Sequence, residues 1–162
     1  MEINASTRYC AVIGHPIQHS ASPTMHNAGI AALGLNWRYL AFDVPPDNLR
    51  AAIEGARTMK FIGLNLTVPH KLLALEMVDE LDVSAQQWGA VNTIRFEARD
   101  AQGQWRSLAQ FAGHVPDEIQ AKASTRTPTR WPARCAKSSI GNLCPALGFY
   151  FLAPAAPDAW PP

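Results

Sequence analysis

The fold of this chain is most clearly indicated by one stretch near its middle, Gly63-Leu64-Asn65-Leu66-Thr67-Val68-Pro69-His70-Lys71. Apolar residues predict a buried strand over residues 61–66, and Pro69 predicts the start of a helix. The side chains of Asn65, Thr67 and Lys71 therefore gather at the carboxyl end of a strand. Because ligands of open α/β sheets bind outside this end of the strands, the stretch predicts an α/β fold with a binding site at that edge.

Two further polar clusters occupy similar places along the chain. One follows a predicted strand and reads His19-Ser20-Ala21-Ser22-Pro23, and the other reads Gly89-Ala90-Val91-Asn92-Thr93. Ser22 is predicted to be the N-cap of a helix, whereas Ser20 has no such local role. Hydroxyl and amide groups near a helix start suit an anion that carries several hydroxyl groups. The three clusters together predict a site for a polyhydroxylated, anionic small molecule.

Strand and helix patterns alternate along the first part of the chain. Strands are expected over residues 9–13, 37–44, 61–66 and 91–97, and residues 100–103 predict a hairpin turn. Helices are expected to begin at Ser22, after Asp47 as N-cap, and at Pro69, with a short one over residues 84–88. This alternation is typical of a largely parallel sheet covered by helices. We therefore expect a three-layer α/β/α domain with a mostly parallel sheet and one antiparallel edge hairpin.

Taken in order, the clusters resemble the substrate-binding domain of the shikimate dehydrogenase family. The matching motifs are Gly14-His15-Pro16-Ile17-Gln18-His19-Ser20-Ala21-Ser22-Pro23, then Asn65 to Lys71, then Gly89 to Thr93. The resemblance covers residues 7–105 and implies an NADP-dependent enzyme that interconverts 3-dehydroshikimate and shikimate in aromatic amino-acid biosynthesis. A relative that acts on quinate is an alternative, because one extra hydroxyl is a small change in a polar site.

The resemblance also implies roles for individual residues. Lys71 would be the general acid/base that protonates the substrate oxygen. The ordinary pKa of lysine is about 10.4, so this role requires burial or a special partner. The two serines would hold the carboxylate, and the amides and the threonine would orient the ring. The implied substrate-binding residues are Ser20, Ser22, Asn65, Thr67, Lys71 and Asn92.

The resemblance stops near residue 105. The family continues with Gly-x-Asn-Thr-Asp and a dinucleotide-binding domain, so the NADP site is expected to be absent from this chain and the chain alone to be inactive. Residues 121–162 hold five Lys or Arg against one acid, Asp158. We therefore expect a domain over residues 1–105 and an unrelated, low-complexity, disordered tail over residues 106–162. A change of reading frame near residue 106 is the preferred interpretation, and a genuine disordered tail is the alternative.

Composition narrows the other possibilities. The 162 residues give room for one ordinary domain, and the net charge of +1 indicates no nucleic-acid partner. The apolar run over residues 143–152 is too short to span a bilayer, and no secretory signal opens the chain. A cytoplasmic protein without a membrane partner is therefore expected. The three cysteines and the histidines lack the spacing of metal ligands, which favours a site without metal.

Two other classes of function stay open at this point. The chain could be a catalytically inactive remnant that binds shikimate weakly, or an interaction module that has taken over the domain. Activity with added NADPH would separate the enzyme from both alternatives. Shikimate binding would separate the remnant from the interaction module.

Overall fold

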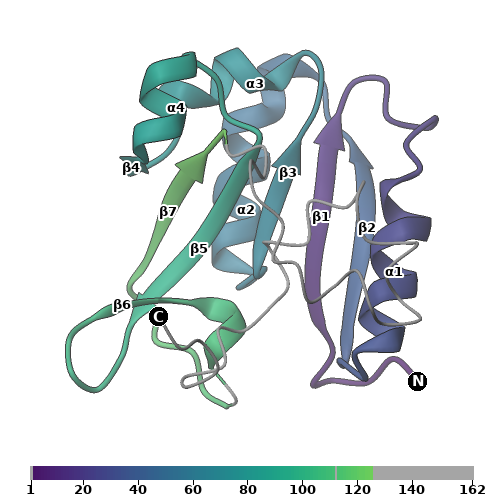
Figure 1. The fold of residues 1–162 in the computed structure, drawn as a ribbon, viewed down its shortest axis with the longest axis vertical. Helices are drawn as coiled ribbons and strands as arrows, with labels where there is room; N and C mark the ends of the chain where they lie inside the picture. The colour runs from purple at the N-terminus through teal and green to yellow at the C-terminus, as the bar shows by residue number, and fades with distance from the viewer. Residues whose placement is uncertain (1, 112, 126–162) are drawn as a thin grey trace, which may run out of the picture.

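The computed structural model describes residues 2–111 and 113–125, whose arrangement is drawn in Figure 1. They form a seven-stranded sheet of order β2-β1-β3-β5-β7-β4, in which β6 pairs with β5. The strands are β1 (Arg8–Gly14), β2 (Trp37–Asp43), β3 (Gly63–Leu66), β4 (Glu80–Leu81), β5 (Thr93–Arg99), β6 (Trp105–Ser107) and β7 (Ile119–Ser124). The α-helices are α1 (Ser22–Ala32), α2 (Leu49–Thr58), α3 (His70–Leu73) and α4 (Val83–Trp88). Short 3₁₀ helices cover Pro46–Asn48, Ala74–Glu76 and Leu108–Gln110.

In the part of the chain that the structure describes, all strands except β5 run in one direction. β1 pairs in parallel with both β2 and β3, while β5 is antiparallel to β3, β6 and β7. β7 therefore runs in the direction of β3, and β4 pairs with it in parallel. The mostly parallel sheet is confirmed. The predicted antiparallel hairpin is present as β5 and β6, joined by the turn over residues 100–103. Its expected place at the edge is wrong for β5, which lies between β3 and β7 in the sheet.

Helices lie on both faces of the sheet, which confirms the three layers (Figure 1). Side chains alternate along β1, as a strand of period two requires. Ala11 and Ile13 pack in one core with Ile53 of α2. Cys10 belongs to the opposite core, together with Ile30 of α1. Cys10 is fully buried, as expected for a small apolar side chain, and burial raises the pKa of its thiol to about 12.

Two helix predictions need correction. A 3₁₀ turn with a hydrogen bond from Asn48 N–H to Pro45 O (3.0 Å) precedes α2, so Asn48 and not Asp47 is the N-cap. The helix expected to begin at Pro69 covers only His70–Leu73, and its Leu72 is 67 % exposed. The backbone tightens into the 3₁₀ helix Ala74–Glu76 before a second turn can form. None of the helices within the described residues is long and apolar enough to cross a membrane.

The fold continues past the predicted boundary at residue 105. β7 lies between β5 and β4, and its Ala121 and Ala123 are fully buried. The Arg8 guanidinium donates to the carbonyl oxygens of Leu108 (2.5 Å) and Phe111 (3.0 Å), which ties this segment to β1. The domain therefore extends to residue 125, because pairing with β5 orders a segment whose own pattern is weak. The rest of the predicted tail, residues 126–162, lies outside the described residues.

Candidate functional site

The three polar clusters lie at the same end of the strands, where β1 and β3 end and β5 begins (Figure 1). We call this end of the sheet the site edge. Thr67 N–H donates to Ile13 O at 3.0 Å, which joins the second cluster to the end of β1. Leu66 N–H donates to Asn92 O at 2.8 Å, which joins the second cluster to the third. Because β5 alone is reversed, its first residues come to the edge at which the other two strands end.

Lys71 is held in place through its own backbone and through the side chain of its neighbour, His70. His70 is fully buried, and its Nε2 lies 2.8 Å from Val44 O at the end of β2. A carbonyl oxygen only accepts, so this nitrogen is the donor and carries the proton. Burial lowers the pKa of His70, which favours this neutral form. Val91 N–H donates to Lys71 O at 2.8 Å. The start of α3 is thus fixed to β2 on one side and to the third cluster on the other.

The Lys71 residue is half-buried, and its bonding differs from that of the other Lys and Arg residues. Among the Lys and Arg residues of the described ranges, it alone forms neither a hydrogen bond nor an ion pair through its side chain. A lysine can bury its apolar stem and keep its charged head in contact with solvent, where the ammonium stays accessible to a ligand. The Lys71 ammonium, which is unpaired among the described residues, is therefore the group at this end of the strands that most directly suggests a polar or anionic ligand.

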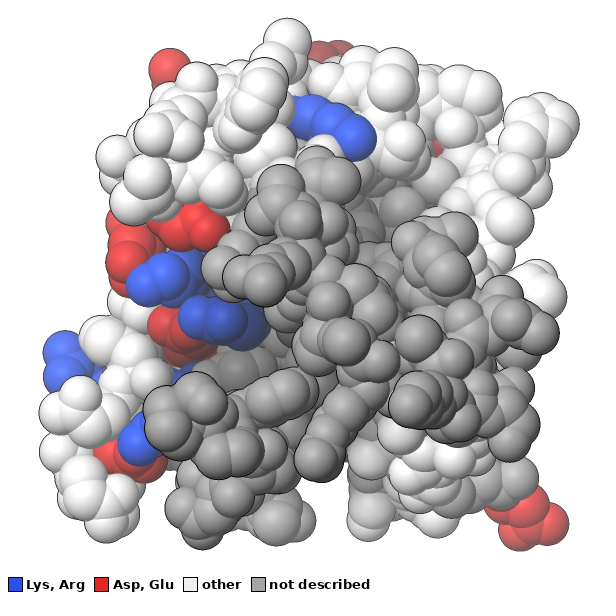
Figure 2. All heavy atoms as spheres, in the orientation of Figure 1, with Lys and Arg blue, Asp and Glu red and all other residues white. Residues whose placement is uncertain are grey.

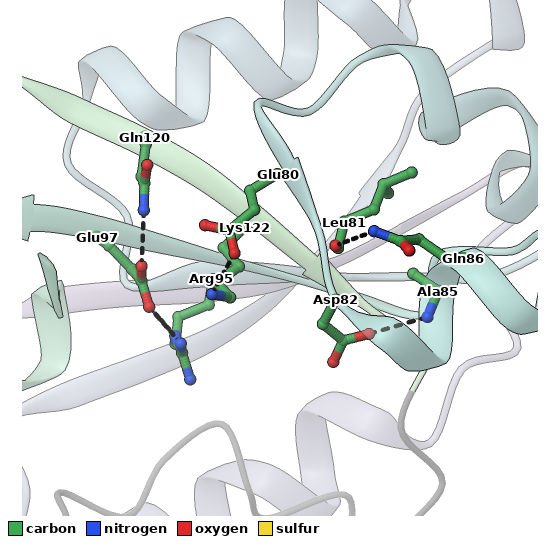
Figure 3. Close-up of polar contacts among 9 residues, drawn as sticks. All are labelled: Glu80, Leu81, Asp82, Ala85, Gln86, Arg95, Glu97, Gln120 and Lys122. Atoms are coloured by element: carbon green, nitrogen blue, oxygen red, sulfur yellow. Dashed lines mark hydrogen bonds and ion pairs between the residues drawn. The ribbon is translucent and has the colours of Figure 1, made fainter.

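Charged side chains elsewhere in the described part of the chain illustrate the contrast. Figure 2 shows acidic and basic side chains close together on the side of the molecule where β4, β5 and β7 lie. Figure 3 shows that they are paired, with Arg95 bound to Glu97 and Lys122 Nζ at 2.5 Å from Glu80 Oε1. These cations are neutralised by their own neighbours and offer no charge to a ligand.

Asn65 is oriented by a line of hydrogen bonds across the sheet. Tyr39 of β2 donates its hydroxyl to Asn65 Oδ1 at 2.7 Å, and Asn65 Nδ2 donates to Thr93 Oγ1 at 3.0 Å. Tyr39 is 1 % exposed, and His26 of α1 stacks on its ring with the centroids 4.0 Å apart. Burial raises the pKa of Tyr39, so the hydroxyl remains a donor. One N–H of the Asn65 amide stays available to a ligand.

Asn92 is fixed from the end of β7. Its Nδ2 donates to Thr125 O at 3.0 Å, and its backbone N–H donates to Ser124 O at 3.0 Å. Thr125 N–H in turn donates to Ser84 Oγ at 3.0 Å, and the Thr125 hydroxyl donates to Ala90 O. The third cluster is therefore held by hydrogen bonds with Ser124 and Thr125, which lie beyond the predicted domain boundary.

The first cluster begins α1, although not as predicted. Met25 N–H donates to Ala21 O at 3.2 Å, so Ala21 is the N-cap and Ser22 is the first helical residue. Ser20 Oγ accepts the Ser22 N–H at 3.3 Å, so the serine expected to lack a local role has one. Both serines are half-buried. Neither forms a side-chain hydrogen bond to the other two clusters within the described residues.

Thr67 lies between the first and second clusters. Its side chain is half-buried, and a Cβ on Gly14 would lie 2.4 Å from its Cγ2. The N-cap of α3 is Pro69, and no side chain caps that helix. Thr67 therefore packs its methyl group against the end of β1, and its hydroxyl has no hydrogen-bond partner among the described residues.

The described residues do not fit a dinucleotide. Asp43, the acid at the end of β2, is held by His15 Nδ1 at 2.7 Å and by Gln18 Nε2 at 2.6 Å, and these bonds lower its pKa. The residues that follow Gly14 in the turn after β1, His15-Pro16-Ile17-Gln18, lack the further glycines of a pyrophosphate-binding loop. Nor does any group of three or more His, Cys, Asp or Glu in the described ranges lie together as metal ligands would.

The sequence did not reveal the residues that orient the site residues through hydrogen bonds. Tyr39 and His70 are buried residues with hydrogen-bonding groups, and the sequence motifs predicted no role for either. Their partners lie in other elements, so no local pattern reveals them. For Tyr39 the available signal was a hydroxyl-bearing residue at a buried strand position, which needs a hydrogen-bond partner. Thr125 fell in the segment assigned to the tail.

Comparison with known proteins agrees with this geometry. The family model of the shikimate dehydrogenase substrate binding domain matches residues 12–94, just over half of the chain. The shikimate dehydrogenase (NADP(+)) of Methanopyrus kandleri is 50% identical over 103 residues, which are 64% of this chain and 36% of that protein. A shikimate dehydrogenase crystal structure in complex with NADP+ has a TM-score of 0.60 and 39% identity, covering 76% of this chain and 36% of the other.

A third relative is the shikimate 5-dehydrogenase of Listeria monocytogenes, solved with shikimate and NAD, at a TM-score of 0.57 and 40% identity. That alignment covers 59% of this chain and 33% of the other. The chain thus spans little more than a third of the length of these relatives. The matched motifs and the shared fold confirm the predicted resemblance: the chain belongs to the shikimate dehydrogenase family, through its substrate-binding domain.

Proposed function

We propose that this chain binds shikimate or 3-dehydroshikimate, as the substrate-binding part of an NADP-dependent shikimate dehydrogenase. The observation that carries the proposal is the half-buried Lys71 residue, whose ammonium has no partner among the described residues and whose backbone carbonyl is bonded to Val91, next to Asn92. The shikimate complex of a relative supports the choice of ligand. The amides and hydroxyls around Lys71 suit the several hydroxyl groups of such a ring.

In this proposal each cluster binds a different part of the ligand. Ser20 and Ser22, at the start of α1, bind the carboxylate with their hydroxyl groups. Asn65 offers its remaining N–H to a ring hydroxyl, because its other groups are used by Tyr39 and Thr93. Thr67 and Asn92 orient the ring from its two sides.

Lys71 is proposed as the group that handles the proton. When a ketone is reduced, negative charge grows on its oxygen, and an ammonium group there stabilises that charge and supplies the proton. The described residues supply no dinucleotide site, so the chain by itself is proposed to bind substrate without turnover.

The proposal is tested by measuring shikimate affinity with ligand-observed NMR on the whole chain. The parent chain is expected to bind with a Kd in the millimolar range. Lys71→Met removes the charge but keeps most of the side chain. Because hydrogen bonds to charged groups contribute about 1.5–3 kcal/mol, the Kd should rise roughly tenfold or more.

Lys122→Met is the matched control, since Lys122 is paired with Glu80 (Figure 3) and β5 separates its strand from β3. It should leave the Kd within about twofold. Equal affinities of the Lys71→Met variant and the parent would refute the role of Lys71. Tighter binding of quinate than of shikimate in the same assay would support the quinate alternative.

A further inference from the structure

The strand β7 ends in the same row of side chains as the candidate site. Thr93 of β5 is the register partner of Asn65 on β3 and of Ser124 on β7. Side chains of register partners lie on the same face of a sheet, with Cβ atoms about 4.5–5.5 Å apart in antiparallel pairs. The hydrogen bond from Asn65 Nδ2 to Thr93 Oγ1 shows that these two side chains lie on one face. The register therefore places Ser124 on the same face, one strand beyond Thr93.

The Ser124 hydroxyl is also the free polar group of that face of β7. Lys122 and Gln120, which share the face with it at period two, are bound to Glu80 (2.5 Å) and Glu97 (2.9 Å), as Figure 3 shows. Ser124 is half-buried, and its hydroxyl has no hydrogen-bond partner among the described residues. Of the three polar side chains on this face of β7, that of Ser124 is therefore the one without a hydrogen-bond partner among the described residues, and it can bond a ligand.

The end of β7 is held firmly enough to present this group. Ser124 O accepts from Asn92 N–H, and Thr125 bonds to Asn92, Ser84 and Ala90 on its far side. These bonds fix the backbone after the Ser124 side chain, and the bond from Asp82 N–H to Ala123 O (2.9 Å) fixes it before. A hydroxyl on a fixed backbone loses little freedom when it binds a ligand.

We propose that Ser124 is a further ligand-binding residue, whose hydroxyl bonds a ring hydroxyl of the polyol on the β7 side of Thr93. This inference rests on the proposed function and extends the site from the three clusters to a fourth segment. In the extended site, Asn65, Thr93 and Ser124 form one row across β3, β5 and β7, with Lys71 and the serines of the first cluster around it.

The test is a pair of ligands measured on the parent chain, on Ser124→Ala and on Ser6→Ala. Shikimate carries the ring hydroxyls, and 1-cyclohexene-1-carboxylate has the ring and the carboxylate without them. Ser124→Ala should raise the Kd for shikimate roughly three- to tenfold, the loss expected for one hydrogen bond. It should leave the affinity for cyclohexenecarboxylate unchanged, because that ligand has no hydroxyl to lose.

Ser6→Ala controls for the loss of a serine hydroxyl, since Ser6 is exposed and precedes β1 at the opposite edge of the sheet. Both ligands should bind this variant as they bind the parent. An unchanged Kd for shikimate in Ser124→Ala, or an equal loss for both ligands, would overturn the inference while leaving the proposed function standing. If the parent chain binds shikimate no better than cyclohexenecarboxylate, the recognition of ring hydroxyls fails altogether, and the inference fails with it.

The amide signals of a ¹⁵N-labelled chain give an independent readout. Saturating shikimate should shift the Ser124 amide signal, and cyclohexenecarboxylate should not. A Ser124 signal that ignores shikimate would also overturn the inference, even if Ser124→Ala weakens binding through a change in the fold.

Discussion

Gly14, where β1 ends against the second cluster, has no room for a side chain. A Cβ at this position would lie 2.4 Å from Thr67 Cγ2 and 2.9 Å from Ile17 Cδ1. The close approach brings Thr67 against the turn that leads to Ser20 and Ser22. The geometry of the first and second clusters therefore depends on a residue that touches no ligand.

Gly14→Ala should destabilise the chain by about 1–3 kcal/mol, as overpacking of a tight contact does. The free energy of unfolding in urea measures this effect. Gly55→Ala is the matched control, because the nearest atom to a Cβ there is Met59 Cε at 4.0 Å and the site is helical. That change should stabilise α2 by roughly 0.5–1 kcal/mol. A Gly14→Ala variant as stable as the parent would contradict the close contact.

His26 makes the stability of the chain depend on pH. Burial lowers the pKa of His26 from its ordinary value to about 4. Between pH 6.5 and pH 4 the unfolded chain therefore binds a proton at His26 that the folded chain does not. Stability falls as pH falls through this window, by up to about 3 kcal/mol at 1.36 kcal/mol for each pH unit.

The variant His26→Phe removes the titrating group and keeps a ring against Tyr39. Its unfolding free energy should lose less between pH 7 and pH 4.5 than that of the parent, and the difference is the contribution of His26. His19→Gln, at an exposed position, should leave the parent's pH dependence intact. Identical pH profiles for His26→Phe and the parent would show that His26 titrates normally in the folded chain.

At the scale of elements, β7 shows why a boundary can be misread. Its six residues alternate between buried Ala121 and Ala123 and the polar Gln120 and Lys122. Alanine has a low preference for strands, so the local sequence signals no strand. The partners β5 and β4 supply the hydrogen bonds that make it one. The strands β1 and β2 were predicted to within one residue, because each carries an apolar run of its own.

The role of β7 predicts how truncated chains behave. A chain that ends after residue 125 should unfold cooperatively in urea with the stability of the parent. A chain that ends after residue 105 leaves one edge of β5 unpaired and β4 without a partner, and it removes Leu108, Val115 and two alanines from the core. Since domains are stable by only about 5–15 kcal/mol, this shorter chain should lose its cooperative transition. Equal transitions, followed by circular dichroism, would restore the boundary at residue 105.

For the molecule as a whole, the sequence revealed the polar groups at the strand ends but not what holds them. Asn65, Thr67, Lys71 and Asn92 stand in short motifs, and strand-end geometry brings them to one edge. The supporting contacts from Tyr39, His70 and Thr125 join residues far apart in the sequence. Such contacts depend on strand order, and the interior place of the reversed strand β5 was not predictable from local patterns.

The most direct test of a shikimate site at this edge is a titration of the ¹⁵N-labelled chain with shikimate, followed by amide chemical shifts. The amide signals of Ser22, Thr67 and Asn92, one from each cluster, should move together along one saturation curve. The exposed end of the sheet around Gly103 should stay unchanged. Signals that do not move, or that move first at Gly103, would contradict the account.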